Sequence, residues 1–592
     1  MPGPNRLQGG AEGLALRAGA LSARLIDGEL RNIRLWDREL VRRVAVVVRD
    51  SAWGTLDNEE VDAAPVQTSS GFSVRVSGRC ERGEIVLDWI ANISSRAGTT
   101  LDCDLELVPR KRFEYNRMGL ILLHPLSRTA GCAFSAGLGN EDTRGLVAET
   151  VDPQPIVDGL PQPVLGPFDR LELFGPEGET TRFSFKGDLF ETEDQRNWAD
   201  GSFKTYAMPL GRGFPLSATG GQPIKQAVRI EFEEPPSTGR ARAATGRADT
   251  AGNSRRGPSP VTVAVGRRCG YIPALGTSLP IDSAADQPLA AAARDQLQPR
   301  YLRVDLDEAD SESPLLGSVG GDLPLEIALS RTDAAERLEA LPKAVRSRAA
   351  RILLLDEATV GVAVARRLLP GVPVIGGSTG QFAEVNRGQL DQHFDGLAFS
   401  LSPQTHLFDD DTLRESLESL ESLARTARQR SGGKPLHIGP LTLRPQRGPG
   451  SEPRRGSPAG TDPRQLSSLA RAWLLGSIAE LGIGGASTIT AFELYGPRSC
   501  FDPAGEHRDV AETIGALSRL EGLPLARTSI SEPTAVAALA YHIANEVRVQ
   551  LANLTNREQR VHLLDFDRRD VLAPGDVRSF SCNGFGNPGD GT

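Results

Sequence analysis

The side chains best suited to chemistry lie within residues 186–206, KGDLFETEDQRNWADGSFKTY. Acids, bases and aromatic rings alternate there, and the middle of the segment follows neither the period of a helix nor that of a strand. A surface loop whose charges cancel is one interpretation. The wall of a polar binding site is the other, because small polar ligands need hydrogen-bonding groups and flat apolar faces. We take the second and select five candidate substrate-binding residues: Asp194, Arg196, Asn197, Trp198 and Lys204.

Further candidate catalytic and substrate-binding residues follow short apolar runs later in the chain. Glu384 comes after VPVIGG, and Glu493 ends the run TITAF. An acid at the end of an apolar run is costly unless it is paired or faces a polar cavity, which favours a function for Glu493. Glu384 could instead pair with a basic residue across a turn. We select Glu384 and Glu493 as catalytic candidates, and the same stretches supply further substrate-binding candidates: Asn386, Arg387, His406, Tyr495 and Arg498.

Two carboxylates on separate strands permit two chemistries. They could flank a glycosidic bond as acid and as nucleophile or base. Alternatively, Glu384 or Glu493 could activate water for attack on an ester carbonyl, while Arg387, His406 or Lys204 stabilises the oxyanion. A serine-dependent acyl-enzyme is not expected. The sequence has no HExxH motif and no compact carboxylate–histidine set, so we expect neither a metal nor another cofactor.

The sequence around these residues changes character along the chain. From about residue 14 to residue 232, apolar and polar residues alternate over short runs, which predicts antiparallel strands and a β-sandwich. Residues 234–260 are rich in Gly, Ala, Arg and Pro, as is typical of a linker. Alternation returns after Pro533. The predicted organisation is an N-terminal β-sandwich (1–233), a linker or insertion (234–264), a catalytic barrel (265–530) and a small C-terminal β-domain (531–592).

Between the linker and the C-terminal domain, apolar strands alternate with helical stretches, which predicts a (β/α)8 barrel of the TIM type. An open doubly wound sheet is the alternative, but no dinucleotide-binding glycine pattern follows the first strand. Function in such barrels lies at the C-terminal ends of the strands. We expect residues 186–206 to pack over that end. The predicted strands are 271–275, 301–306, 325–329, 352–355, 372–375, 396–401, 436–443 and 488–492, and the predicted helices are 333–349, 360–369, 411–430, 465–481 and 509–520.

Composition narrows the class of protein. Acids outnumber bases 76 to 67, so a nucleic-acid partner is not expected. No apolar run is long enough to cross a bilayer, and the first residues lack a signal-peptide pattern, which predicts a cytoplasmic protein without a membrane partner. The six cysteines show no zinc-binding or disulfide spacing. Oligomeric state stays open.

Several motifs, in order along nearly the whole chain, resemble the D-apionate lactonase family. The resemblance implies a β-rich N-terminal domain, a TIM barrel similar to those of glycoside hydrolases, and a small C-terminal β-domain. It also implies hydrolysis of D-apionolactone, or a related aldonolactone, to the sugar acid during breakdown of the branched pentose apiose. The motifs are GDLFETEDQRNWADGSFKTY, GQFAEVNR, SPQTHLFDDDTLRESL, GPLTLRPQ, TDPRQLSSLARAWLLGSIAEL, TAFELYGPR and VQLANLT.

The chain also departs from the family pattern. The last barrel strand of the family usually reads close to YYETTGWRG, whereas this chain reads AFELYGPR, which lacks the Trp but keeps Glu493 and Arg498. The Asn-Pro pattern that usually follows GPLTLRP is replaced by an Arg/Gly/Pro-rich insertion. We therefore expect a carboxylic ester hydrolase that opens a sugar lactone. The alternatives are a glycoside hydrolase that uses Glu384 and Glu493, and a non-catalytic carbohydrate-binding relative.

Overall fold

The computed structural model describes residues 13–583 apart from 37, 97, 158, 235–258, 281–286, 308–320, 389–392, 449 and 454–457. Most of the predicted linker, 234–264, lies outside the described residues. The chain forms two compact units. The first comprises Met1–Gln195 and Ser202–Pro258, and the second comprises Arg196–Gly201 and Ser259–Thr592. Six residues from within the N-terminal region therefore fold with the second unit.

The first unit is built from two nine-stranded antiparallel sheets, as the period-two sequence predicts. Strand β7, for example, alternates buried and less buried residues along its length, so one face lines the core. The first sheet contains, in order, β1 (Leu14–Ala18), β2 (Leu21–Ile26), β3 (Glu29–Leu35), β4 (Arg38–Asp50), β9 (Phe113–Pro125), β18 (Ser202–Ala207), β17 (Phe190–Asp194) and β14 (Leu165–Phe168), with β19 (Leu216–Ala218) beside β9. The second contains β11 (Glu141–Leu146), β10 (Ala133–Leu138), β15 (Arg170–Phe174), β16 (Thr180–Lys186), β20 (Ile224–Glu233), β8 (Thr100–Pro109), β7 (Ile85–Arg96), β6 (Gly71–Arg82) and β5 (Glu59–Gln67).

Short elements complete the first unit. They are α1 (Leu126–Thr129), the pair β12 (Ile156–Val157) and β13 (Leu160–Pro161), and the 3-10 turn η2 (Leu210–Arg212). The turn η1 (Gln195–Trp198) begins with Gln195 of the first unit, and its other residues belong to the second.

The second unit contains a closed barrel of eight parallel strands, so the predicted TIM-type barrel is confirmed and the open sheet is excluded. Each predicted barrel strand overlaps an observed one. In order, the strands are β22 (Ala274–Ser278), β23 (Tyr301–Asp305), β24 (Leu325–Leu329), β25 (Ala349–Leu355), β26 (Val374–Gly377), β27 (Leu397–Leu401), β28 (Leu436–Leu441) and β29 (Thr488–Glu493). Apolar runs form these strands because both faces of a barrel strand are covered.

The helices around the barrel differ from the prediction in two ways. Helices α2 (Gln287–Leu297) and α7 (Phe382–Arg387) were not predicted, and one predicted helix is broken. Residues 333–349 are predicted as one helix, but α4 (Ala334–Ala340) and α5 (Lys343–Arg346) are separate. Pro342 explains the break, because proline disfavours helical geometry at Leu341 and cannot donate a backbone hydrogen bond. The other helices and 3-10 turns are η4 (Asp356–Gly361), α6 (Val362–Leu368), α8 (Asp410–Arg430), α9 (Ser468–Gly484), α10 (Asp509–Ser518) and η5 (Leu564–Phe566).

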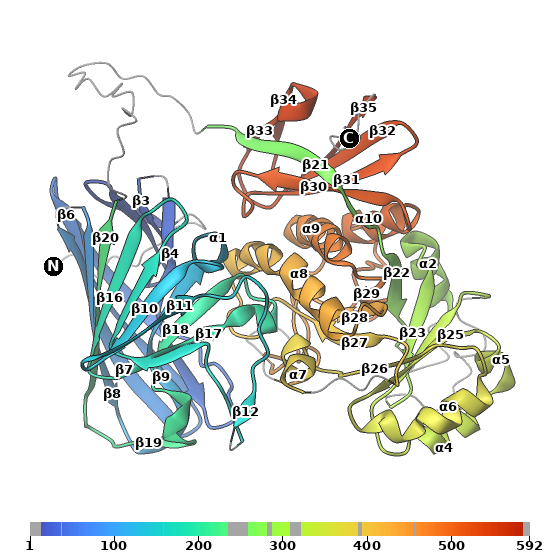
Figure 1. Ribbon diagram of the computed structural model, residues 1–592, viewed down its shortest axis with the longest axis horizontal. Coiled ribbons are helices and arrows are strands. Elements are labelled where there is room, and N and C mark those ends of the chain that lie inside the picture. The colour runs from blue at the N-terminus through green and yellow to red at the C-terminus, as the bar shows by residue number, and fades with distance from the viewer. Residues whose placement is uncertain are drawn as a thin grey trace. The chain divides into compact units, whose positions relative to one another are not determined.

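A seven-stranded sheet follows the barrel in sequence but also includes a strand that precedes it. Its order is β34 (Arg568–Leu572), β33 (Gln559–Leu563), β21 (Val261–Tyr271), β30 (Pro524–Ile530), β31 (Val536–Ile543), β32 (Glu546–Asn553) and β35 (Val577–Asn583). Figure 1 shows β21 in light green among the red C-terminal strands. Helix α9 packs against β31, β21 and β30, so the barrel and this sheet share a helix. Among the described residues, none of the helices combines the length and the apolar character needed to cross a membrane.

A half-buried acid lies where α9 meets this sheet. Burial raises the pKa of Glu480 on α9 to about 7, although Arg527 on β30 opposes the shift. The unfolded chain releases this proton near pH 4.5, whereas the native chain keeps it up to about pH 7. Native stability should therefore fall as pH rises through this window.

We predict that Glu480→Gln stabilises the protein at pH 8 by about 1–3 kcal/mol and has little effect near pH 4.5, where both states hold the proton. Thermal unfolding at the two pH values measures this difference. Glu558→Gln, at an exposed turn, serves as the control. Equal changes in Tm at both pH values would contradict the prediction.

Candidate active site

The second unit brings together most of the residues selected from the sequence. Glu384, Asn386 and Arg387 lie on α7 directly after β26, and His406 follows β27. Glu493 ends β29. All of these positions lie at or beyond the carboxyl ends of barrel strands, where TIM-barrel enzymes carry their sites. Arg196, Asn197 and Trp198 join them, because Arg196–Gly201 belongs to this unit.

Asp200 of this segment makes a short polar contact with the barrel. Its Oδ2 lies 2.5 Å from Nδ1 of His406, and both side chains are about nine-tenths buried. An ionised carboxylate can only accept, so Nδ1 carries the hydrogen, and Nε2 is an acceptor when the imidazole is neutral. Asp200 was not selected from the sequence, although it is one of the five acids of residues 186–206. The preceding residue, Ala199, has φ 60°, and this left-handed turn directs the chain from Trp198 to Asp200.

Aromatic and amide contacts surround this pair. The Trp198 ring meets the His406 ring edge-on, with centroids 5.7 Å apart, and the Arg387 guanidinium lies 5.1 Å from the centroid of the Trp198 ring. Nδ2 of Asn386 donates to Oδ1 of Asn197 over 2.8 Å. One histidine, one arginine and one indole ring thus share a small region of the barrel mouth.

Each candidate glutamate has an arginine partner. Oε1 of Glu384 accepts from Arg387 over 3.0 Å, and the Glu384 side chain is 46% exposed. This is the turn pairing that the sequence left open as an alternative. Oε1 of Glu493 accepts from Nε of Arg498 over 2.6 Å, and the Glu493 side chain is only 6% exposed.

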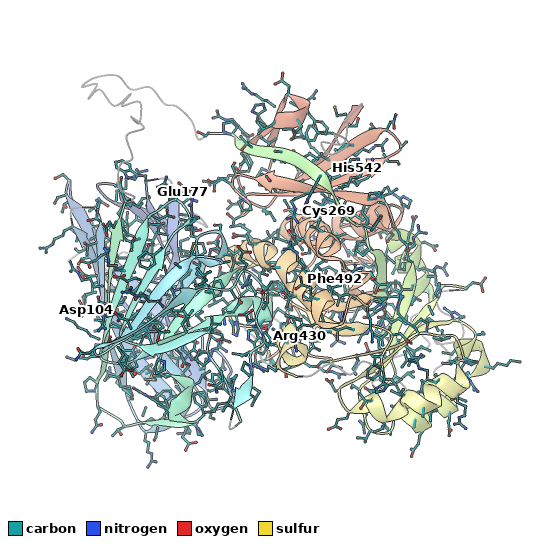
Figure 2. All side chains as sticks on the ribbon, viewed as in Figure 1. Asp104, Glu177, Cys269, Arg430, Phe492 and His542 are labelled. Atoms are coloured by element: carbon teal, nitrogen blue, oxygen red, sulfur yellow. The ribbon has the colours of Figure 1, made fainter. Side chains whose placement is uncertain are left out.

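The backbone before Glu493 is unusual. Phe492, labelled in Figure 2, has φ 56° and is fully buried, a conformation that is rare for a bulky residue. The β22–β29 ladder shifts register at this point, and Ser278 pairs with Glu493. The irregularity ends the strand and sets the direction of the Glu493 side chain. Nearby, the Tyr495 hydroxyl donates to the carbonyl of Pro280 over 2.8 Å.

Asp194 and Lys204, the other two selected residues, belong to the first unit. Asp194 ends β17 and is buried. Nζ of Lys204 lies 3.3 Å from Glu193 Oε2 and 3.2 Å from Gln195 Oε1. Burial would raise the pKa of Glu193, but the nearby cations, led by Lys204, hold it below the ordinary value.

The turn after β26 contains a pattern that the sequence reasoning overlooked. Residues 376–380 read GGSTG, which matches GxSxG between a strand and a helix. Ser378 Oγ donates to Asp356 over 2.6 Å and accepts from the Gly380 amide, so a carboxylate rather than a histidine holds the hydroxyl. Ser378 is also not among the described residues with positive φ, so the strained turn of a nucleophile elbow is missing.

Two hollows lie in this part of the barrel. One is lined by Glu384, Asp356, Ser378 and Lys434, among others. The other lies at the ends of β23, β27 and β28 and is lined mostly by polar residues: Arg303, Asp305, Thr379, Ser400, Ser402, Thr442, Gln446 and Arg447, with Leu401, Pro440 and Pro445. Sequence reasoning missed Arg303 and Asp305, although their i, i+2 spacing within a strand puts both side chains on one face.

The long segment after β28 is held by a buried arginine. Arg444 donates to the backbone carbonyls of Gly450, Glu452 and Thr461, over 2.8, 2.6 and 3.2 Å respectively. Its guanidinium also lies 5.2 Å from the Phe408 ring. The described residues Gly450, Glu452 and Thr461 of this insertion are therefore all bound to Arg444. Within the described residues, no group of three or more His, Cys, Asp or Glu side chains is placed to hold a metal ion.

Comparison with known proteins agrees with this architecture. The sequence-family model of the D-apionate lactonase N-terminal domain matches residues 7–235. The sequence-family model of the D-apionate lactonase TIM barrel domain matches residues 355–522. A D-apionate lactonase from Brucella anthropi is 28% identical, over 93% of this chain and 94% of its own. The chain belongs to the D-apionate lactonase family. The family resemblance drawn from the motifs is thus confirmed.

The solved structures that resemble this member of the lactonase family do so only weakly. A GH30 endoxylanase from Clostridium papyrosolvens is 12% identical with a TM-score of 0.36, over 55% of this chain and 100% of its own. A GH36 α-galactosidase from Geobacillus stearothermophilus is 10% identical with a TM-score of 0.30, over 96% of this chain and 99% of its own. Similarity at this level carries no information on substrate or mechanism.

The contacts of Arg444 with the insertion that distinguishes this chain from the family pattern lead to a testable prediction about stability. Arg444→Met keeps the apolar bulk but leaves three carbonyls without their donor, which should cost about 2–4 kcal/mol of stability. We predict faster proteolytic cleavage within residues 445–462 and a lower Tm. Limited proteolysis with mass mapping measures the first effect. Arg560→Met, on an exposed position of β33, is the control, and unchanged cleavage in Arg444→Met would refute the expectation.

Proposed function

We propose that this chain is a sugar lactonase, which opens D-apionolactone or a related aldonolactone to the corresponding sugar acid. Family membership and the D-apionate lactonase of Brucella anthropi support the reaction class. The Asp200–His406 pair at the barrel mouth is the observation that carries the proposal. It supplies a positioned base with a fixed tautomer, which can accelerate hydrolysis of an ester bond by water.

In the proposed mechanism, Nε2 of His406 accepts a proton from water while the water oxygen attacks the lactone carbonyl. Asp200 holds the Nδ1 hydrogen and stabilises the imidazolium that forms. The tetrahedral intermediate then collapses, the bond from the carbonyl carbon to the ring oxygen breaks, and the ring oxygen takes the proton from His406. Water and lactone thus give one hydroxy acid, with no cofactor in the proton balance.

The arginines at the mouth are the proposed electrophilic groups. Arg387 contacts the same Trp198 ring as His406, which puts its positive charge in the same part of the barrel mouth as the proposed base. Arg498 is held by Glu493. Positive charge at the developing oxyanion stabilises the transition state more than the neutral lactone. Glu493 and Glu384 then act mainly by positioning these arginines, although direct activation of water by either carboxylate is the competing role.

The base assignment predicts a large loss of rate. His406→Gln should lower kcat for the preferred lactone by roughly 100-fold or more, because the proton acceptor is removed. Asp200→Asn should lower kcat in the same direction, because the amide no longer stabilises the imidazolium. Steady-state kinetics with purified variants measures both.

His562→Gln in the C-terminal sheet is the matched control for this substitution, and its kcat should not change. A His406→Gln enzyme that opens the lactone at the wild-type rate would eliminate His406 as the base. The lactonase reaction itself could then still proceed through a carboxylate.

A double-mutant cycle tests whether Glu493 positions Arg498 or acts as the general base. If Glu493 positions Arg498, Glu493→Gln and Arg498→Gln should each lower kcat/KM by about 10-fold or more, and the double variant should lose little beyond either single change. A general base would instead give a loss of about 100-fold or more in Glu493→Gln, whether or not Arg498 is present. The same cycle with Glu384→Gln and Arg387→Gln tests the other pair. Additive losses would contradict the positioning role.

A substrate screen tests the function class as a whole. Sugar lactones should be opened, whereas aryl glycosides should not be cleaved. Cleavage of an aryl glycoside that Glu384→Gln or Glu493→Gln abolishes would favour the glycoside hydrolase alternative. Binding of sugars without turnover of either class would favour the non-catalytic one.

A further inference from the structure

The polar hollow at the ends of β23, β27 and β28 is built around an ion pair. Arg303 is almost fully buried, and the Asp305 side chain is 29% exposed. Nη2 of Arg303 donates to Oδ1 of Asp305 over 3.0 Å, and Nε donates to Oδ2 over 3.3 Å. A guanidinium fork of this kind fixes the plane of the carboxylate. Asp305 is therefore presented to the hollow in one orientation.

Residues deeper in the barrel keep Arg303 in place. Nη1 of Arg303 donates to the carbonyl of Gly439 over 2.6 Å and lies 3.9 Å from Glu326 Oε1. Glu326 in turn accepts from Nε of Arg351 over 2.7 Å and from the Thr490 hydroxyl over 3.2 Å. Because charges this deeply buried are costly to leave unpaired, the network constrains Arg303 strongly.

Three hydroxyls that line the hollow offer acceptors rather than donors. The Thr379 hydroxyl donates to Asp356 over 2.6 Å, and the Thr442 hydroxyl donates to the carbonyl of Arg444 over 2.6 Å. The Ser402 hydroxyl likewise donates to the carbonyl of Leu443 over 3.0 Å. Each hydroxyl has thus used its hydrogen within the protein and has only acceptor capacity left.

A ligand that meets Asp305 and these hydroxyls must bring hydrogen-bond donors. Each Asp305 oxygen accepts one N–H from Arg303 and can accept a further hydrogen bond. Two acceptor oxygens on one carbon suit two hydroxyl groups on adjacent carbons of a ring. The geometry points to Asp305 as the residue that recognises a vicinal pair of hydroxyls on the lactone, and so sets the specificity for polyhydroxylated lactones. This inference rests on the proposed function for its reaction, but not for its binding step.

The hollow is connected to the His406 pair by one amide side chain. Nε2 of Gln381 donates to the Ser402 carbonyl over 3.1 Å and to the Thr405 hydroxyl over 2.8 Å, and its Oε1 accepts from the Ser402 amide. Ser402 lines the hollow, and Thr405 directly precedes His406. A ring bound by Asp305 is thereby placed relative to the proposed base.

The test compares a γ-lactone that carries a vicinal hydroxyl pair with unsubstituted γ-butyrolactone. The wild-type enzyme should prefer the hydroxylated lactone by about 100-fold or more in kcat/KM, because the analogue brings no hydroxyls to the remaining acceptor positions of Asp305. Asp305→Asn should lower kcat/KM for the hydroxylated lactone by about 30-fold or more, chiefly through KM, and change the value for γ-butyrolactone by less than about 3-fold. The exposed Asp322→Asn, just before β24, is the matched control.

Two further measurements keep the inference open to refutation. Circular dichroism and Tm establish that Asp305→Asn is folded; if it is not, Thr379→Val takes its place, with a selective loss of about 3-fold or more expected. Calorimetric titration with the hydroxylated lactone, or with its stable cyclic ether analogue, reports binding without turnover. Equal losses for both lactones, or unchanged affinity in Asp305→Asn, would overturn the role of Asp305.

The two proposals fail in different ways. A wild-type enzyme that opens both lactones equally well contradicts the specificity role and leaves the lactonase proposal standing. A wild-type enzyme that opens neither lactone, but binds the cyclic ether through Asp305, contradicts the lactonase proposal and leaves the recognition role standing.

Discussion

The hydrogen bond between Asp200 and His406 is the contact on which the candidate site depends, and it joins positions 206 residues apart. It exists because Arg196–Gly201 leaves the strands β17 and β18 that flank it in sequence and folds with the barrel unit. The same six residues carry Asn197 to Asn386 and Trp198 to Arg387. A barrel expressed from Ser259 onward would therefore lack the partner of its histidine, however well its eight strands closed.

The fold could be predicted from the sequence wherever the pattern of apolar and polar residues reflects which faces of an element are buried. Barrel strands are covered on both faces and appear as apolar runs, and sandwich strands are covered on one face and alternate, so both classes can be recognised. The break between α4 and α5 is missed when apolar periodicity is weighed above the proline at 342. The inclusion of β21 in the C-terminal sheet could not be foreseen, because its neighbours β30 and β33 lie more than 250 residues further along.

The residues of the candidate site were harder to predict from the sequence than the fold. Asn197 and Trp198 were found by composition alone, whereas Asp200 could not be distinguished from the four other acids of its segment without knowledge of which residues leave the first unit. Lys204 carries the same signal, yet it lies on β18 with Glu193 as its partner. Arg303 and Asp305 could have been recognised in the sequence, since two charges spaced by two residues interrupt an otherwise apolar strand. A charged pair inside a barrel strand is therefore as informative about a binding site as polar residues beyond the strand ends.

The ion pair in the polar hollow also bears on how turnover would end. Lactone opening converts a neutral ring into a carboxylate, while Asp305 keeps its negative charge throughout. A carboxylate that accepts hydroxyl hydrogens from the ring attracts the neutral substrate but repels the anion that replaces it, and a partly buried site screens this repulsion less than water does. The charge that recognises the hydroxyls would thereby offset part of the attraction of the site's arginines for the product carboxylate, which favours product release.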